Sequence, residues 1–405
     1  MNHPSRICVR ILAGLVVSSP LYATQYFIDI LPPPLIHPVG INAKGEVAGD
    51  GGVYDDRVHA FTRLQCTGPN CSVKLTSIND YSLVAGAIRY DDPNSLGGVA
   101  LKPAYWQPKL SLAPNVLFGT LPNAATFIAG ISDTNDFAGQ FDSAQMSEGI
   151  DYYVVALNPQ GWGEQFFLFP FGFCGAPAHH PWSVATGVND AHHVTGTADW
   201  SQVALSGSCM PGVHPFIAID GRLTDLLEVP NGLDVFYARA NAINNSDAVV
   251  GDAFAPGDVL GQNNNTAALY GPSSVTYLGT IQNQQSQNSS ALAINDYNEI
   301  VGWSDVSIPG NPFPTTVQHA FVSTGVGMSD LTSLITPDSP LAGKVVLTHA
   351  NAINCNGWIV ADGYDVATNT AHAYVLKPRP QPVRADCLKK LAYPDEAPTF
   401  PIPTE

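Results

Sequence analysis

Positive charge is scarce in this sequence. Lys and Arg together number 17 against 34 Asp and Glu, which gives a formal net charge of −17 at pH 7. Proteins that bind nucleic acid present basic surfaces, so this balance argues against a nucleic-acid partner. Only 13% of the residues are charged, whereas Gly and Pro number 36 and 33. A chain with few charges and many turn-forming residues is typical of an all-β protein.

Long apolar runs are also missing. Residues 11–17 form a short apolar run, with Arg6 and Arg10 before or beside it and a plausible cleavage point at Ala23. This pattern predicts a secretory signal peptide over residues 1–23, because the run is too short to cross a bilayer. Removing Arg6 and Arg10 would leave 15 basic against 34 acidic residues, a net charge of about −19. We therefore expect a secreted or periplasmic protein with no membrane span.

The familiar catalytic motifs are absent. The sequence has no Gly-x-Ser-x-Gly, no His-Glu-x-x-His and no phosphate-binding glycine loop. The acidic segments 132–136 and 295–299 lack the residue order of a calcium loop, and turn chemistry explains them more simply. We expect no metal and no cofactor.

Seven segments of eleven residues align without gaps. They are 40–50, 77–87, 130–140, 187–197, 242–252, 293–303 and 352–362, of which "AINDYNEIVGW" is the sixth. The third position is Asn in six copies and Ser132 in one, and the tenth is Gly in six copies and Ala361 in the last. Asn at the third position is expected to start a tight turn, since its side chain can accept from backbone N–H groups ahead of it. Each copy is thus predicted to be strand, turn, strand.

These copies recur with a mean period of about 52 residues between Asn42 and Asn354. Looser elements accompany them, such as "HAF" at 59–61 and 319–321 and "DL" within 223–229 and 328–335, so each repeat holds about four short strands. Four strands in a repeat of this length predict a β-propeller blade. The prediction is an all-β, seven-bladed β-propeller over residues 24–378, in which strands near Phe27 and Val375 meet to close the ring. A Pro-rich C-terminal tail follows over residues 379–405 and is expected to be an extended strap.

The linked "DL", "AIN…IVG" and "HAF" elements resemble those of the HAF family of extracellular bacterial repeat proteins, over roughly residues 25–377. The His of that pattern is present at four of seven places, and Ala361 departs from the Gly. The resemblance implies an exported repeat protein and brings no catalytic residues.

The histidines allow two interpretations. His59, His214, His319 and His372 recur at equivalent places on different blades, which favours hydrogen bonds to neighbouring strands over a shared metal site. A denser group could supply metal ligands or an acid–base residue, although turn and strand roles are the simpler interpretation: His179, His180, His192 and His193.

Six cysteines remain after the signal peptide, an even number that favours disulfides in an exported chain. The repeat register suggests the pairs Cys66–Cys71, Cys174–Cys209 and Cys355–Cys387. A zinc site is the rival interpretation, but the spacings match no usual ligand pattern.

The residue after the tenth position varies inside an otherwise fixed motif. If its strand lies near the ring axis, these side chains converge on the channel mouth and are candidate ligand-binding residues: Asp50, Gln140, Thr197, Asp252, Trp303 and Asp362. They would suit a neutral or cationic ligand. The alternative is that this position faces solvent and drifts.

The predicted function is an exported binding or scaffold module whose ligand is a carbohydrate or another protein. The alternative is a polysaccharide-degrading enzyme, a lyase or glycoside hydrolase, with its site at the channel mouth. No catalytic residue can be named from the sequence.

Overall fold

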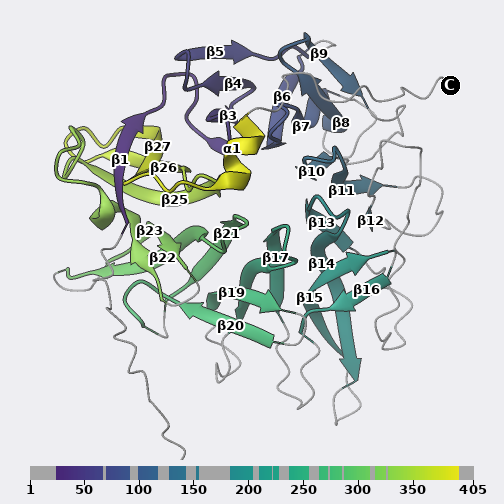
Figure 1. The fold of residues 1–405 in the computed structure, drawn as a ribbon. Coiled ribbons are helices and arrows are strands. Elements are labelled where there is room, and N and C mark those ends of the chain that lie inside the picture. The colour runs from purple at the N-terminus through teal and green to yellow at the C-terminus, as the bar shows by residue number, and fades with distance from the viewer. Residues whose placement is uncertain are drawn as a thin grey trace, which may run out of the picture.

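A computed structural model describes residues 24–66, 70–91, 99–116, 127–142, 152–154, 183–203, 209–220, 222–227, 237–254, 264–271, 274–284, 287–310, 315–324 and 327–391. The fold is an all-β propeller, in which seven antiparallel sheets are arranged around a common axis (Figure 1). Each sheet carries one copy of the eleven-residue motif, so repeats one to seven are numbered by that copy.

Repeat one forms β2 (Pro38–Ile41), β3 (Glu46–Gly49), β4 (Gly52–Asp55) and β5 (Ala60–Arg63). Repeat two forms β6 (Ser72–Ile78), β7 (Val84–Asp91), β8 (Val99–Gln107) and β9 (Ser111–Val116). Repeat three forms β10 (Phe127–Ile131), β11 (Phe137–Asp142) and β12 (Tyr152–Val154). Repeat four forms β13 (Ser183–Val188), β14 (Val194–Val203), β15 (Cys209–Ile219) and β16 (Arg222–Asp225).

Repeat five forms β17 (Ala238–Ile243), β18 (Val249–Phe254), β19 (Asn265–Gly271) and β20 (Ser274–Gly279). Repeat six forms β21 (Ser289–Ile294), β22 (Ile300–Ile308), β23 (Thr315–Ser323) and β24 (Ser329–Asp330), followed by a 3₁₀ turn at Leu331–Leu334. Repeat seven forms β25 (Val345–Ile353), β26 (Ile359–Asp365) and β27 (Ala371–Arg379). Its fourth strand is β1 (Gln25–Ile30), from the other end of the chain.

The number of complete blades corrects the prediction. Six sheets have four strands, not seven, and the sheet of repeat three, β10–β11–β12, has three strands among the described residues. Seven copies of the motif predicted seven blades, but the motif covers only the first two strands of a blade. The outer strands belong to the looser elements, which do not recur equally.

The ring closes as predicted. Strand β1 pairs antiparallel with β27, so that Phe27 lies opposite Lys377 and Asp29 lies opposite Val375. The two ends of the repeat array therefore share one sheet, ordered β1-β27-β26-β25. This pairing removes two free sheet edges, which a ring of blades needs to avoid edge-to-edge association.

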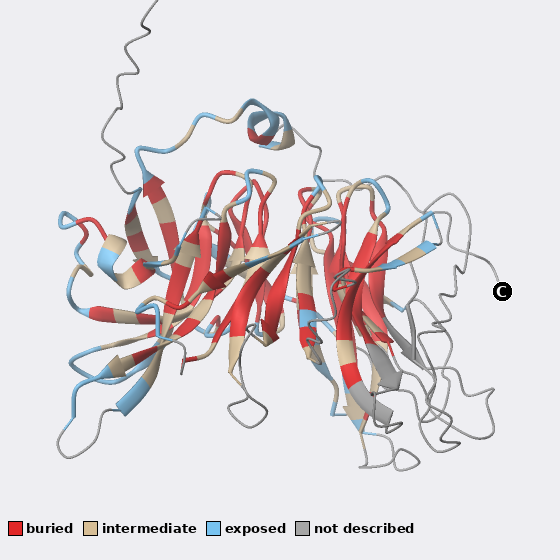
Figure 2. Ribbon diagram, turned by 90° about the horizontal axis from the view of Figure 1, so that it is seen from below, coloured by how far each residue is buried: buried red, intermediate tan, exposed pale blue. Residues whose placement is uncertain are grey.

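The hydrophobic core lies between neighbouring blades. One cluster joins Val250 and Leu278 of repeat five to Ile300 and Phe321 of repeat six, and similar clusters fill the other interfaces. Figure 2 shows the buried residues concentrated in the strands around the axis. Figure 1 places β10, β13, β17, β21 and β25 nearest the centre, with β5, β16 and β20 at the rim.

A fixed glycine shapes the first strand pair of each blade. A Cβ on Gly302 would collide with the carbonyl oxygen of Ser290 on the paired strand, and Gly251 faces the carbonyl of Arg239 in the same way. The slot in repeat seven holds Ala361, and this strand pair carries a second bulge, between Leu347 and His349. The expectation of a close backbone approach at the glycine is thus confirmed, and the exception coincides with a change of backbone register.

The recurring "HAF" and "DL" elements are joined by side chains. His214 Nδ1 lies 2.8 Å from Asp225 Oδ2, and His319 Nδ1 lies 2.7 Å from Asp330 Oδ2. In both cases the His is on the third strand of the blade and the Asp on or beside the fourth, so these two histidines contact a neighbouring strand as expected.

Two of the three expected disulfides are present, Cys66–Cys71 and Cys355–Cys387. The third expected pair, Cys174–Cys209, lies outside the described residues, as do His179, His180 and the signal peptide at 1–23. The second disulfide joins repeat seven to a helix, α1 (Ala385–Leu391). This helix corrects the expectation of a wholly extended strap after residue 379. No helix in the described part of the chain is long and apolar enough to cross a membrane.

Candidate functional site at the propeller axis

The third motif position builds a turn at the axial end of every first strand. In repeat five, Asn244 Oδ1 accepts from the backbone N–H groups of Ser246 and Ala248, both at 3.0 Å. The other five motif asparagines accept from the residues two and four positions ahead in the same way, and Ser132 Oγ accepts from Asp136 N at 3.0 Å. These turns, called the Asn turns below, confirm the predicted role of the asparagine.

Each asparagine also reaches the next blade, which the sequence did not suggest. Asn244 Nδ2 donates to the carbonyl oxygen of Asn295 at 3.0 Å. The same bond links repeats one to two, two to three, four to five, six to seven and, through Asn354 and Asn42, seven to one. A single amide therefore satisfies its own turn and ties two blades together, which explains why the residue is Asn rather than another turn former.

One step lacks this bond. Ser132 has no amide to donate from repeat three to repeat four. There, His192 Nδ1 of repeat four lies 2.6 Å from Asp136 Oδ2 of repeat three. The unusual His192, at a turn position with φ of 66°, therefore makes a blade-to-blade contact where the regular one is missing.

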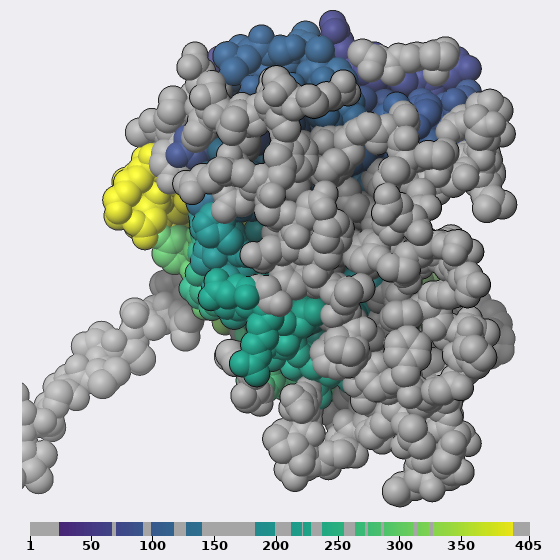
Figure 3. Space-filling view, turned by 90° about the vertical axis from the view of Figure 1, so that its right-hand side faces the viewer, coloured from purple at the N-terminus to yellow at the C-terminus, as the bar shows by residue number. Residues whose placement is uncertain are grey.

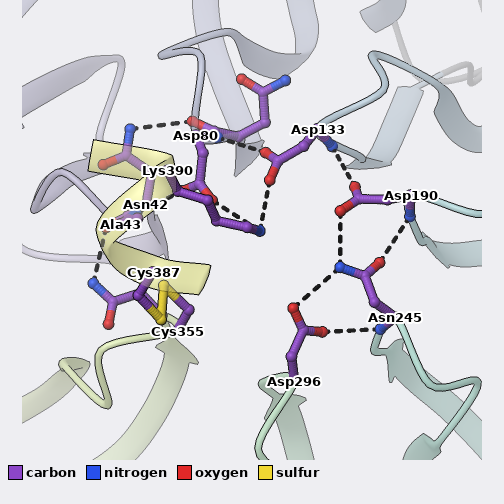
Figure 4. A network of polar contacts seen from close by, with 12 residues as sticks. Asn42, Ala43, Asp80, Asp133, Asp190, Asn245, Asp296, Cys355, Cys387 and Lys390 are labelled. Atoms are coloured by element: carbon purple, nitrogen blue, oxygen red, sulfur yellow. Dashed lines mark hydrogen bonds and ion pairs between the residues drawn. A yellow bond between two sulfur atoms is a disulfide. The ribbon is translucent and has the colours of Figure 1, made fainter. Parts of the chain in front are cut away.

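The fourth motif position forms a second series of bonds, which runs from repeat one to repeat six. The backbone N–H of Asp80 donates to Asp133 Oδ1 at 2.8 Å, and that of Asp133 donates to Asp190 Oδ1 at 2.7 Å. Similar bonds run from Ala43 to Asp80, from Asp190 to Asn245 and from Asn245 to Asp296. Four carboxylates are thereby fixed around the axis by backbone donors of the preceding blade (Figure 4).

These residues surround an axial pocket of about 240 Å³. Its wall consists of the second, third and fourth motif positions of most repeats, and Lys390 of α1 also lines it. The fourth-position residues that line the pocket are Asp80, Asp133, Asp190, Asn245, Asp296 and Cys355. The pocket is thus apolar at its Ile and Val side chains and strongly acidic at the fourth position.

Helix α1 lies over this end of the ring (Figure 2), and Figure 3 shows it protruding from the same face of the molecule. Lys390 Nζ lies 3.0 Å from Asp80 Oδ2 and 2.7 Å from Asp133 Oδ2. At the other end of the same segment, Arg384 pairs with Glu299, with Nη2 to Oε1 at 2.7 Å, and its Nη1 donates to the carbonyl oxygen of Cys355 at 2.6 Å. The segment from Arg384 to Leu391 therefore spans the mouth from repeats six and seven to repeats two and three.

Burial and like charge set the protonation of the pocket. Burial, together with the negative charge of Asp133, raises the pKa of Asp80 to about 7, although Lys390 opposes this rise. Burial, with a smaller effect of Asp133, also raises the pKa of Asp190. Burial disfavours the Lys390 ammonium, but Asp80 and Asp133 outweigh that cost and raise the pKa of Lys390. At neutral pH the lysine is charged and Asp80 titrates.

Of the six residues predicted at the channel mouth, five lie on the second strand of their blade and Asp50 directly follows β3; none of them lines the axial pocket. Where their contacts are described, they are made within the blade or with the next one. Thr197 Oγ1 accepts from Ala240 N at 3.1 Å, and Asp252 Oδ1 accepts from Ser290 Oγ at 2.9 Å. The side chain of Gln140 lies outside the described part of the structure. Ligand binding by these residues stays a prediction.

Three of the six are brought together at the start of the inner strands, the end opposite the Asn turns. Trp303 and His349 have ring centroids 6.0 Å apart, and His349 lies opposite Asp362 across the strand pair. Asp362 Oδ1 is 3.7 Å from the Nδ1 of His37, whose backbone N–H donates to Asp50 Oδ2 at 2.6 Å. Burial lowers the pKa of His349 and raises that of Asp362.

The pocket residues could have been found from the sequence. Asp or Asn follows the third motif position in five copies, so the position directly after the turn asparagine was visible as a recurrent acid. It was assigned to turn chemistry because nothing in the sequence showed that the seven turns face one axis. Among the described residues, no group of three or more His, Cys, Asp or Glu side chains is arranged to hold a metal ion.

No family model matches the chain, and no curated protein does either. Among solved structures, the chain is similar to the β-propeller domain of the Trilobed protease from Pyrococcus furiosus, described as having an open velcro topology, with 11% identity over 76% of this chain and 96% of that one and a TM-score of 0.34. A structure named glycoside hydrolase matches with 8% identity, over 92% of this chain and 96% of that one, and a TM-score of 0.27. At these scores the likenesses carry no argument about activity.

Proposed function

We propose that the protein is an exported binding or scaffold propeller of the HAF type, and that it takes its ligand at the axial pocket. The observation that carries the proposal is the ring of carboxylates at the fourth motif position. Each is fixed by a backbone donor of the neighbouring blade, so the ring is rigid, and rigid polar groups in a concave site are what ligand binding requires.

The chemistry of the pocket favours a ligand that carries an ammonium group. Carboxylate oxygens accept hydrogen bonds from such a group, and their charge attracts it. Lys390 supports this choice because its own ammonium lies between Asp80 and Asp133. A lysine side chain of a protein partner and an amino sugar of a glycan both offer this group. Two disulfides in the described chain are compatible with a site of action outside the cytoplasm.

The test is a screen of the purified full chain against amino-sugar and neutral oligosaccharides and against lysine-containing peptides, by isothermal titration calorimetry. Asp190→Asn and Asp296→Asn together should weaken binding at least tenfold, because they remove two carboxylates of the ring that do not pair with Lys390. Asp365→Asn serves as the matched control, since Asp365 ends β26 outside the axial pocket and its carboxylate accepts from Ala367 N and Thr368 N of the turn that follows. Equal affinity of the ring variant and the control would refute the axial site.

One observation favours a second candidate, a polysaccharide-degrading enzyme. Asp80 has a pKa of about 7 beside a second carboxyl group, Asp133, and a carboxylic acid that titrates near neutral pH is suited to general acid catalysis. The same screen decides between the candidates when it is also scored for product release. Cleavage products that form with the natural chain and disappear with Asp80→Asn would favour the enzyme, whereas binding without products favours the binding module.

A further inference from the structure

The segment from Arg384 to Leu391, called the C-terminal segment here, is held by polar anchors rather than by a hydrophobic face. Cys387 is the only buried residue of α1, while Leu388 and Leu391 are 53% and 43% exposed. Val383, just before the segment, is 90% exposed. A helix of this length has little stability of its own in water, so the anchors must hold it in place.

Three anchors fix the segment across the pocket mouth. Arg384 makes two hydrogen bonds to the Glu299 carboxylate, Cys387 is joined to Cys355, and Lys390 lies between Asp80 and Asp133. Glu299 belongs to repeat six and Cys355 to repeat seven, whereas Asp80 and Asp133 belong to repeats two and three. The segment therefore links repeats six and seven to repeats two and three along one side of the pocket mouth, and Lys390 reaches from it into the group of carboxylates (Figure 4).

The Lys390 anchor lies where the ligand of the proposed function would lie. Its neighbour Lys389 is 75% exposed and pairs only with Asp386 of the same helix, whereas the Lys390 side chain is 16% exposed. Of these two adjacent lysines, Lys390 is inserted between the carboxylates and Lys389 faces solvent. An ammonium group tethered so close has a high effective concentration and competes with a free one.

We propose that the C-terminal segment is an intramolecular plug, with Lys390 as its internal ligand and the Cys355–Cys387 disulfide as its tether. The proposal rests on the axial pocket being the ligand site. A ligand whose ammonium group takes the place between Asp80 and Asp133 must displace Lys390 to bind there, so the plug sets the affinity of the pocket for such a ligand. The disulfide keeps the displaced segment near the mouth and lets it return.

The experiment uses cadaverine, a small primary diamine, as the probe. Lys390→Met and the pair Cys355→Ser with Cys387→Ser should each bind it at least about tenfold more tightly than the natural chain, because the competitor is removed or untethered. Lys389→Met and the pair Cys66→Ser with Cys71→Ser are the matched controls and should bind as the natural chain does. Calorimetry measures the affinities.

Hydrogen exchange of residues 385–391 gives a second readout that needs no ligand. Exchange should be faster in Lys390→Met and in the Cys355/Cys387 variant than in either control, and cadaverine should accelerate it in the natural chain. If Lys390→Met binds cadaverine no better than the natural chain, the plug is wrong while the pocket stands. If no variant binds cadaverine, the ligand chemistry proposed above is wrong, and unchanged exchange in both variants would then overturn the plug as well.

Discussion

The step from repeat three to repeat four differs from the other six blade-to-blade steps. At those six, a motif asparagine donates to the carbonyl of the next motif residue, as Asn244 does to Asn295. At the seventh, Ser132 takes the place of the asparagine, and His192 reaches back to Asp136 instead. The comparison shows that the asparagine has two separable roles, since serine retains the turn and loses the bond to the next blade.

The difference also shows how the ring tolerates an exception. The inner bond from Asp133 N to Asp190 Oδ1 is retained at the irregular step, at 2.7 Å. At this step the inner bond is thus kept, and the contact between His192 and Asp136 takes the place of the asparagine bond. The motif asparagine can be replaced where another side chain links the two blades. Ser132 and His192 therefore belong together, since His192 makes the link that Ser132 cannot make.

The largest expected effect compares the tenth motif position, on the second strand of the blade, in repeats six and seven. Gly302→Val should destabilise the fold by more than about 3 kcal/mol, because the new side chain would collide with the backbone carbonyl of Ser290. Ala361→Gly, in the equivalent slot of repeat seven, should cost only about 1 kcal/mol through backbone entropy. Denaturant unfolding measures both. Similar costs at the two positions would contradict the account of the second bulge.

A second effect concerns the step that Lys390 bridges, between repeats two and three. Lys390→Met should cost about 2 kcal/mol at pH 8, less than the ~3–5 kcal/mol of a fully buried pair because the side chain is partly exposed. Lys389→Met should cost almost nothing.

This loss should depend on pH. The pKa of Asp80 is raised to about 7 in the folded protein from 3.8, so the stability from its proton is present below about pH 4 and is lost as the pH rises through 7. Without Lys390 the ionised carboxylates of Asp80 and Asp133 lose their paired cation at pH 8, whereas at pH 5 Asp80 is protonated. The melting temperature of Lys390→Met should therefore fall relative to that of the natural chain between pH 5 and pH 8. A difference that stays constant over this range would exclude the ion pair as its source.

The regular step gives a third effect. Asn244→Ala should cost about 2 kcal/mol, because two backbone N–H groups of the turn lose their acceptor and the carbonyl of Asn295 on the next blade loses one of its two donors. Ser132→Ala should cost about half as much, since serine caps only its own turn. Thermal melts of the two variants compare the steps directly, and equal losses would mean that the blade-to-blade bond contributes nothing.

The sequence allowed the strand–turn–strand unit, the propeller and the ring closure at Phe27 and Val375 to be predicted, because these follow from local turn chemistry and from the repeat period. The prediction of seven complete blades was wrong, because the motif does not specify the outer strands, and the sheet of repeat three has three strands among the described residues. The axial pocket was missed for a different reason. Its residues, such as Asp133 and Asp190, lie 57 positions apart in the sequence and meet only where consecutive blades pack around the axis, and Lys390 joins them from a tail whose position no repeat encodes.

The smallest effect tests whether Ser132 and His192 are one exception. His192→Asn alone should cost about 1 kcal/mol, because it removes the contact with Asp136 at an exposed position. Adding Ser132→Asn supplies the missing side-chain amide in repeat three. Its acceptor would be the Asn that His192→Asn places in repeat four, just as Asn298 Oδ1 of repeat six accepts from Asn244 Nδ2 at 2.9 Å. The free energy of unfolding of the double variant should then be within about 0.5 kcal/mol of that of the natural chain. A double-mutant cycle tests this, because the coupling energy between the two positions should be stabilising and offset the loss from His192→Asn. Simple addition of the two single effects would show that the irregular step is held by Asp133 and Asp190 alone, and that the histidine there is incidental.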